Sequence, residues 1–238
     1  MFCKRIKEPK PEKAPNHVNS LQSQIFILDN EEGDKEDERH MEIDLGALAP
    51  RDAHDMLVSA LIPRPIAWVS SISGQGQANL APFSFFCGVT WSPPTLGFSV
   101  VNRADGSRKD TIVNIEETGQ FVVNMVSHDL AARMVKTAST LPRGVSEADE
   151  AGVALIAAVK VSAPRVKDAR VAFECALDRI VTVGQGGHAG NLVLGTILLV
   201  HVQDGIVEGG KGIDPLRFDA IGRLGGSSFC RTGTIFEL

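Results

Sequence analysis

The first residues whose types and spacing suggest chemistry lie between positions 102 and 111, which read Asn-Arg-x-x-Gly-Ser-Arg-Lys-Asp-Thr. Three cations stand close to a predicted helix start: Arg103, Arg108 and Lys109. The hydroxyls of Ser107 and Thr111, the free N–H groups of a helix start and a lysine together favour the binding of a phosphate. A solvated helix cap with ordinary surface charges is the alternative interpretation of this stretch taken alone.

A proline interrupts a second segment, residues 79–86, which reads Asn-Leu-Ala-Pro-Phe-Ser-Phe-Phe in an otherwise β pattern. Pro82 removes a donor from a strand ladder, which predicts an edge strand or bulge with neighbouring backbone groups free for a ligand. Phe83, Phe85 and Phe86 can wall an apolar pocket. An irregular core strand explains the segment equally well, but its pairing with the anion-binding stretch one strand away favours a ligand site.

Other motifs that carry chemistry are missing or lack their structural context. Gly184-x-Gly186-x-x-Ala189 matches a dinucleotide fingerprint, but a strand pattern follows it, which predicts a glycine-rich hairpin or loop. The sequence has no P-loop, HExxH or complete GxSxG motif, and its six histidines show no metal-ligand spacing, so no metal site is predicted. Tyrosine is absent, which excludes Ser/Tyr/Lys dehydrogenase chemistry.

The composition predicts a soluble protein of the cytoplasm. A net charge of -5 argues against nucleic acid or an anionic membrane as a partner. The four cysteines form no CxxC or Cys/His cluster, which is typical of reduced thiols. No apolar run reaches the ~20 residues that span a bilayer, and the N-terminus lacks the apolar core of a signal peptide.

Three regions are predicted along the chain. Residues 1–40 are rich in Lys, Glu and Asp and poor in large apolar groups, which predicts a disordered tail. Residues 41–226 form the predicted domain, and residues 227–238 a C-terminal extension. Translation starting at Met41 is the corresponding hypothesis about the tail.

The domain pattern is mainly β with helical insertions. Strands are predicted at 66–72, 79–90, 95–101, 121–126, 159–166, 171–183 and 192–204. Helices are predicted at 51–60, from a Ser107-x-x-Asp110 capping box to Gly119, and at 127–136, where Leu130 and Met134 share a face; a surface loop is predicted over 137–149. Strands with inserted helices describe a β-barrel rather than alternating βαβ units.

Several segments, in order and at the right spacing, resemble the flavin reductase-like family. They are 62–70 (Ile-Pro-Arg-Pro-Ile-Ala-Trp-Val-Ser), 79–86, 107–115, 121–124, 173–177 and 192–195. The resemblance runs from about residue 41 to about residue 226. It implies a six-stranded Greek-key split β-barrel that binds FMN, in a homodimer with the flavin near the interface.

The resemblance also implies cofactor-binding residues: Arg64, Ser70, Asn79, Ala81, Pro82, Ser84, Ser99, Ser107, Lys109 and Thr111. Residues 79–84 are expected along the isoalloxazine and ribityl parts, and Ser70 and Ser99 on strands beside them. Lys109 and Thr111, helped by Ser107, are expected at the phosphate, with Arg64 as a further contributor. Where many relatives read Gly-Asp-His near the nicotinamide, this chain reads Gly186-Gly187-His188, so the role of His188 stays open and no catalytic residue is assigned.

Three functions follow from these observations. The first is an oxidoreductase whose FMN accepts hydride from NADH or NADPH and passes electrons to free flavin or another acceptor. The second is an FMN-binding electron carrier, similar to flavoredoxin, without nicotinamide turnover. The third is a relative on the same barrel that oxidises pyridoxamine phosphate or binds haem or a deazaflavin, because one fold hosts several activities.

Overall fold

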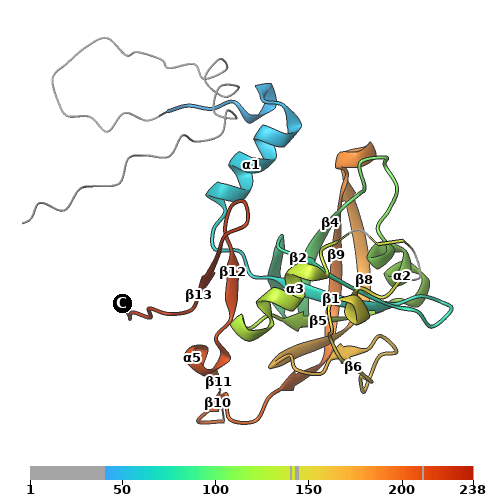
Figure 1. Cartoon of the computed structure of the whole chain (residues 1–238), viewed down its shortest axis with the longest axis vertical. Helices are drawn as coiled ribbons and strands as arrows, with labels where there is room; N and C mark the ends of the chain where they lie inside the picture. The colour runs from blue at the N-terminus through green and yellow to red at the C-terminus, as the bar shows by residue number, and fades with distance from the viewer. Residues whose placement is uncertain (1–40, 140, 143–144, 211, 238) are drawn as a thin grey trace, which may run out of the picture. The chain divides into compact units, whose positions relative to one another are not determined.

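The computed structural model describes residues 41–139, 141–142, 145–210 and 212–237 (Figure 1). The predicted disordered tail, residues 1–40, lies outside the described residues. The chain divides into two compact units, residues 1–58 and 59–238. No described helix is long and apolar enough to cross a membrane.

The described part of the first unit is short and helical. A 3-10 turn, η1 (Leu45–Ala47), begins after Asp44, whose carboxylate accepts the N–H of Gly46 at 2.8 Å. Helix α1 (Pro50–Ala60) follows and continues past the boundary at residue 58. Proline suits the first position of a helix because its missing N–H has no partner there. The helix predicted at 51–60 is confirmed.

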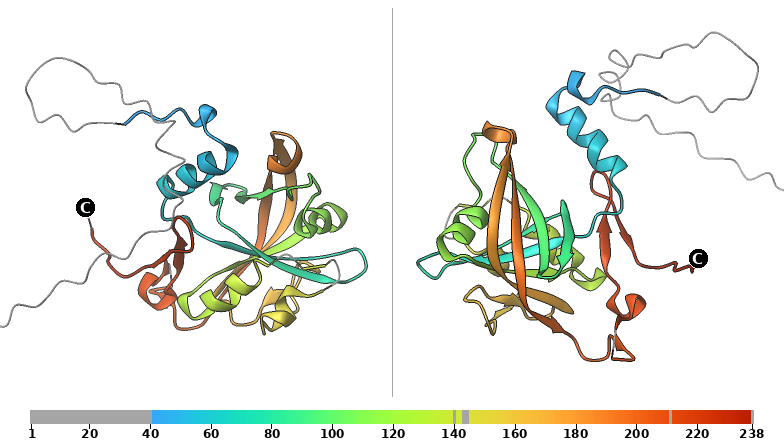
Figure 2. Two further views of the ribbon diagram at one scale, coloured as in Figure 1. Left: turned by 45° about the horizontal axis from the view of Figure 1, so that its top comes forward. Right: turned by 180° about the vertical axis from the view of Figure 1, so that it is seen from behind.

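A seven-stranded antiparallel sheet forms the centre of the second unit, in the order β2-β1-β5-β8-β9-β4-β3. Its strands are β1 (Ala67–Ile72), β2 (Ala78–Phe83), β3 (Phe86–Trp91), β4 (Pro94–Val101), β5 (Gln120–Met125), β8 (Val171–Val183) and β9 (Gly190–Val202). Strands β8 and β9 form one long hairpin with η3 (Gly186–His188) at its tip (Figure 2). The glycine-rich hairpin predicted at 184–189 is therefore confirmed.

The sheet curls because one continuous segment supplies both of its edges. Strands β2 and β3 lie at opposite ends of the strand order, yet only Ser84 and Phe85 separate them along the chain. Three residue steps span at most about 11 Å, so the two edges meet at this point. The N–H of Ser99 on β4 donates to the carbonyl of Phe85 at 2.8 Å and holds the crossing. The predicted barrel is confirmed. Its sheet has seven strands instead of the six that the resemblance implied, because the segment 79–90 breaks into β2 and β3.

The interior of the barrel is aromatic at its centre. Phe98 on β4 is fully buried between two other rings. Its ring centroid lies 5.5 Å from that of Phe83 and 5.4 Å from that of Phe121. Edge-to-face and tilted pairs at such distances stabilise a core beyond the area that they bury.

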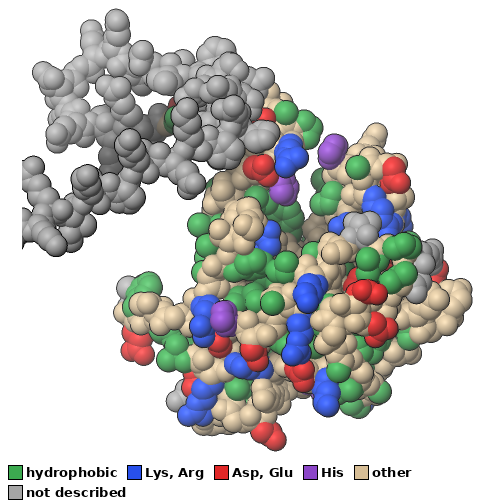
Figure 3. Space-filling model, viewed as in Figure 1, with side chains coloured by type: hydrophobic (Ala, Val, Ile, Leu, Met, Phe, Trp, Pro, Cys, Tyr) green, Lys and Arg blue, Asp and Glu red, His purple; other side chains and the backbone are tan. Residues whose placement is uncertain are grey.

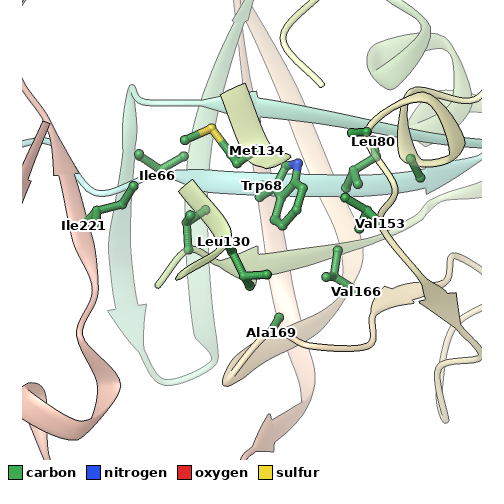
Figure 4. Packing of buried hydrophobic residues seen from close by; sticks show 12 residues of the cluster. Ile66, Trp68, Leu80, Leu130, Met134, Val153, Val166, Ala169 and Ile221 are labelled. Carbon is green, nitrogen blue, oxygen red and sulfur yellow. The ribbon is translucent and has the colours of Figure 1, made fainter. Parts of the chain in front are cut away.

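A second apolar cluster covers the outer face of β1. Trp68 packs there with Leu130 and Met134, and its Nε1 donates to the Thr137 hydroxyl at 2.8 Å (Figure 4). Leu130 ends η2 (His128–Leu130), and Met134 lies in α3 (Ala131–Lys136), which confirms the predicted apolar face. Strand β1 is consequently buried on both faces.

Two predicted segments are wrong. Of the strand predicted at 159–166, only β7 (Arg165–Val166) forms, paired with β6 (Leu155–Ile156). The N–H groups of Val159 and Lys160 bind the Glu174 carboxylate, at 2.8 and 2.5 Å, instead of a neighbouring strand. The surface loop predicted at 137–149 contains a short helix, α4 (Glu147–Glu150).

The remaining described elements follow β9. They are β10 (Val207–Glu208), β11 (Gly212–Ile213), α5 (Pro215–Phe218), β12 (Ile221–Arg223) and β13 (Phe229–Arg231). β10 pairs with β11, and β12 with β13. On the face shown in Figure 3, basic and acidic side chains are interspersed, without one extended basic surface.

Candidate functional site

A cavity of about 170 Å³ lies between the edge strand β2 and the start of helix α2 (Asp110–Thr118). Its lining comes from four parts of the chain. The lining residues are Asn79, Ala81, Pro82, Phe83, Arg103, Lys109, Asp110, Thr111, Thr137, Ala138, Ser139, Leu141 and Glu147. We call this hollow the Lys109 cavity.

Strand β2 presents unpaired backbone to the cavity because it is the last strand of its sheet. The N–H of Leu80 points away from β1 and donates to Glu147 Oε2 at 3.4 Å. Pro82 lies two residues later, so its nitrogen also faces away from β1, where the ladder needs no donor. The prediction that Pro82 marks an edge strand is confirmed.

The predicted capping box at the start of α2 is wrong. The N–H and hydroxyl of Ser107 bind the Asp105 carboxylate at 2.8 and 2.6 Å, within the preceding turn. Asp110 instead pairs with Arg103 at 2.9 Å. The helix therefore begins three residues later, at Asp110, with Lys109 as its N-cap and no side chain capping its first turn. Gly119 ends it in the left-handed conformation, as predicted.

Lys109 is the uncompensated cation of the cavity. Its Nζ lies 5.7 Å from the centroid of the Phe83 ring, and within the described chain it forms no ion pair. Burial and the nearby Arg103 lower the pKa of Lys109 below its usual value. A half-buried ammonium without a paired carboxylate is partly desolvated, so an anion entering the cavity gains an attraction that no described ion pair uses.

A buried hydrogen bond joins the strand to the helix beneath the cavity. Asn79 Nδ2 donates to the Thr111 hydroxyl at 3.0 Å, and both side chains are buried. One turn further along α2, Asn114 Nδ2 donates to the Ser71 hydroxyl at 3.3 Å. These contacts tie α2 to strands β2 and β1.

Glu147 is the residue of this cavity that the sequence did not reveal. The sequence predicts a surface loop at this position. In the structure Glu147 begins helix α4 and lines the cavity, where its carboxylate accepts the N–H of Leu80. Burial, aided by the charge of Asp110, raises the pKa of Glu147 above its usual value. The motif Ser146-Glu147-Ala148-Asp149 signals a capped helix, and Ser146 does accept the N–H of Asp149, but nothing in it signals a ligand site.

A second hollow, of about 390 Å³, follows along the same segment beyond Phe83. It is lined by Ala60, Leu61, Ile62, Pro63, Arg64, Pro65, Ser84, Phe85 and Phe86. Arg64 Nε donates to the Ser84 hydroxyl at 3.4 Å, and Nη2 donates to the Leu224 carbonyl at 3.0 Å. Burial and the charge of Arg223 lower the pKa of Arg64. We call this the Ser84 hollow.

The structure brings together some of the predicted site residues and separates others. The Lys109 cavity contains Asn79, Ala81, Pro82, Lys109 and Thr111. Arg64 and Ser84 line the adjacent Ser84 hollow. Ser70, Ser99 and Ser107 line neither of them.

Each of these three serines has a local reason for its position. Ser70 shares the outer face of β1 with Trp68, and its hydroxyl donates to the Pro164 carbonyl at 2.5 Å. Ser99 lies on the face of β4 opposite Phe98, because side chains alternate along a strand. Ser107 is exposed and bound to Asp105.

No group of three or more His, Cys, Asp or Glu side chains in the described ranges is arranged to hold a metal ion. His188 is exposed at the tip of the β8–β9 hairpin and lines neither hollow.

Known proteins are similar to this chain in both sequence and structure. The sequence pattern of the "Flavin reductase like domain" family matches residues 59–220. An uncharacterized protein of Aquifex aeolicus is 39% identical over 178 residues, which cover 75% of this chain and 89% of the relative.

Two solved structures are similar over most of both chains. Nitrilotriacetate monooxygenase component B from Bacillus cereus is 34% identical with a TM-score of 0.80, covering 84% of this chain and 98% of that chain. The 2-nitrobenzoate 2-nitroreductase NbaA of Pseudomonas fluorescens is 32% identical with a TM-score of 0.75, covering 83% and 94%.

Proposed function

The chain belongs to the flavin reductase-like family, and from this premise we propose that it is an FMN-binding oxidoreductase. In this proposal it takes electrons from NADH or NADPH and passes them to free flavin or another acceptor. It acts in the cytoplasm as a homodimer.

The observation that carries the proposal is the adjacency, along one edge segment, of the cavity that contains Lys109 and a hollow lined by Phe85 and Phe86. Phe83 lines the Lys109 cavity, and its chain neighbour Ser84 lines the second hollow. FMN has a matching polarity, with a phosphate at one end and a planar ring at the other. The half-buried Lys109, without an ion pair in the described chain, fits the phosphate in both charge and position.

The residues divide between the two ends of the proposed ligand. Lys109, Thr111 and Arg103 hold the phosphate at the start of α2. The edge residues Asn79, Ala81, Pro82 and Ser84 lie along the ribityl chain and ring, with Arg64 behind Ser84. Ser70 takes no part, because its hydroxyl is already bound within the fold.

When bound, FMN supplies hydride and electron transfer, which none of the protein's own side chains provides. The protein binds the ends of the cofactor, orients its ring with the β2–β3 crossing and covers the phosphate with Thr137, Ala138 and Ser139, which line the same cavity. Because the cofactor supplies the redox chemistry, the protein needs no catalytic acid–base pair.

Exposed apolar strand residues support the homodimer. Strand β3 ends at Trp91, which is 92% exposed, and Val181 and Val183 are exposed near the end of β8. A fully exposed tryptophan is a candidate contact with a partner subunit, because aromatic residues are enriched at protein–protein interfaces. A monomer in sedimentation experiments at micromolar concentration would count against a dimer.

An electron carrier without direct nicotinamide turnover is the second candidate. It is favoured by the position of His188, which is exposed at a hairpin tip and lines neither hollow. A carrier needs the flavin site but no nicotinamide site.

Anaerobic rapid mixing of the holoprotein with NADH and with NADPH separates the two. Bleaching of the flavin absorbance by either nucleotide supports the reductase. A flavin that both nucleotides leave oxidised, but that a partner protein reduces, supports the carrier. The mass of the extracted cofactor tests FMN against haem and a deazaflavin, and turnover of pyridoxamine phosphate by the holoprotein tests the oxidase.

A further inference from the structure

The Lys109 cavity contains a carboxylate that a phosphate site does not require. Glu147 and Lys109 line the same space of about 170 Å³, and in the described chain they form no ion pair with each other. Glu147 is held in place by the N–H of Leu80. An anion bound by Lys109 therefore lies close to a second anion.

The nearby Arg103 attracts the Glu147 carboxylate, but burial and the charge of Asp110 outweigh this attraction and leave the pKa of Glu147 raised. Arg103 is paired with Asp110 at 2.9 Å, and that carboxylate adds to the negative charge near Glu147. Strand β2 contributes no ionisable side chain, and on α4 itself Asp149 and Glu150 are exposed. Among described residues, the titratable groups that line the cavity with Glu147 are Arg103, Lys109 and Asp110.

We infer that Glu147 determines how tightly this site holds a phosphate-bearing flavin, and that it keeps FMN exchangeable rather than permanently bound. The inference rests on the proposed function. Repulsion between the Glu147 carboxylate and the phosphate opposes the attraction of Lys109 and Arg103. A flavin without phosphate, riboflavin, is not subject to this repulsion.

The same arrangement couples binding to a proton. Glu147 is already easier to protonate than an ordinary glutamate, because burial disfavours its charged form. An approaching phosphate disfavours the carboxylate further, so FMN binding takes up a proton at the Glu147 carboxyl. FMN affinity accordingly rises as the pH falls through the titration of Glu147.

Whether FMN exchanges distinguishes the reductase from the electron carrier. A reductase that supplies free reduced flavin must release it, whereas a carrier must retain it. Glu147 favours the first, since it weakens the site at the one group that distinguishes FMN from riboflavin.

Isothermal titration calorimetry with FMN and riboflavin tests the inference on the full chain. The proteins are wild type, Glu147→Gln and a matched control, Glu150→Gln, which changes an exposed acid on the same helix. Glutamine at 147 still accepts the Leu80 N–H, so the fold is retained. At mildly alkaline pH we expect Glu147→Gln to bind FMN about tenfold more tightly, the effect of removing one nearby like charge. Riboflavin affinity and the control variant stay unchanged.

Calorimetric titrations in buffers of different ionisation enthalpy measure the number of protons that the protein takes up when FMN binds. The difference in proton uptake between wild type and Glu147→Gln isolates Glu147, because the titration of the phosphate itself is common to both. A further measurement needs only the wild-type protein. The ratio of its FMN affinity to its riboflavin affinity should rise as the pH falls through the titration of Glu147.

The outcomes separate this inference from the proposed function. Equal FMN affinity and proton uptake in wild type and Glu147→Gln would overturn the inference while leaving the flavin site intact. A wild-type protein that binds neither flavin would overturn both. Tighter binding of both flavins by Glu147→Gln would also overturn the inference, because the effect would not depend on the phosphate.

Discussion

Removal of the Lys109 ammonium tests most directly whether the Lys109 cavity binds the phosphate of FMN. Lys109→Met keeps an apolar stem against Phe83 and deletes the charge that lies 5.7 Å from that ring. Lys109 is already partly desolvated in the protein without a ligand. Binding of a phosphate therefore adds the attraction between the two charges without a further large desolvation penalty for Lys109.

A charge-assisted contact of this kind contributes about 2 kcal/mol, which corresponds to a roughly 30-fold higher Kd for FMN. The partial burial of Lys109 limits screening, so the effect persists at moderate salt. Quenching of flavin fluorescence on titration with protein measures the Kd. Riboflavin is the ligand control, and Lys136→Met, which removes an exposed cation at the end of α3, is the protein control.

Two results would refute the reasoning. Unchanged FMN affinity in Lys109→Met would show that the phosphate binds elsewhere. An equal loss of affinity for FMN and riboflavin would show that Lys109 acts on the shape of the site rather than on the phosphate.

The remaining predictions concern the fold. Gly195→Ala places a Cβ 2.3 Å from Phe121 Cζ, and this ring is fully buried, so we expect a loss of about 1–3 kcal/mol in urea unfolding. Trp68→Phe removes the bond to Thr137 and leaves a small void, for which we expect a loss of about 1–3 kcal/mol. Burial alone would raise the pKa of Glu174, but the hydrogen bonds that it accepts lower it overall. Its stabilising effect is therefore present above the pKa of the unfolded chain and lost as the pH falls through the lower folded value. The gap in unfolding free energy between wild type and Glu174→Gln should narrow in that acid range, and a constant gap would contradict the assignment.

Local patterns in the sequence predicted most of the sheet. Leu96, Phe98 and Val100 alternate with small residues, and the structure buries all three. Pro82 correctly indicated an edge, because a missing N–H is tolerated only where no ladder bond is needed. Gly119 correctly marked the end of α2, since its φ of 67° suits glycine.

The errors arose where side chains compete for backbone groups. Ser107 had a suitable cap spacing, but Asp105 is nearer in the chain and takes both of its donors. Residues 159–166 have a strand pattern, but the Glu174 carboxylate on β8 accepts the N–H groups of Val159 and Lys160, so these two residues join no strand ladder. Neither competitor is visible from periodicity, because each depends on a specific contact.

The sequence alone was enough to indicate strands, an interrupted edge segment and a cationic helix start, because each depends on neighbours within a few positions. The order of these elements and the family resemblance indicated a β-barrel. Folding decided which of these features share a space. Strand β1 is buried on both faces, so alternation could not show that Ser70 points away from the barrel interior. Glu147 stands 38 positions beyond Lys109 in the chain, and only the packing of α4 against β2 brings both side chains to one cavity.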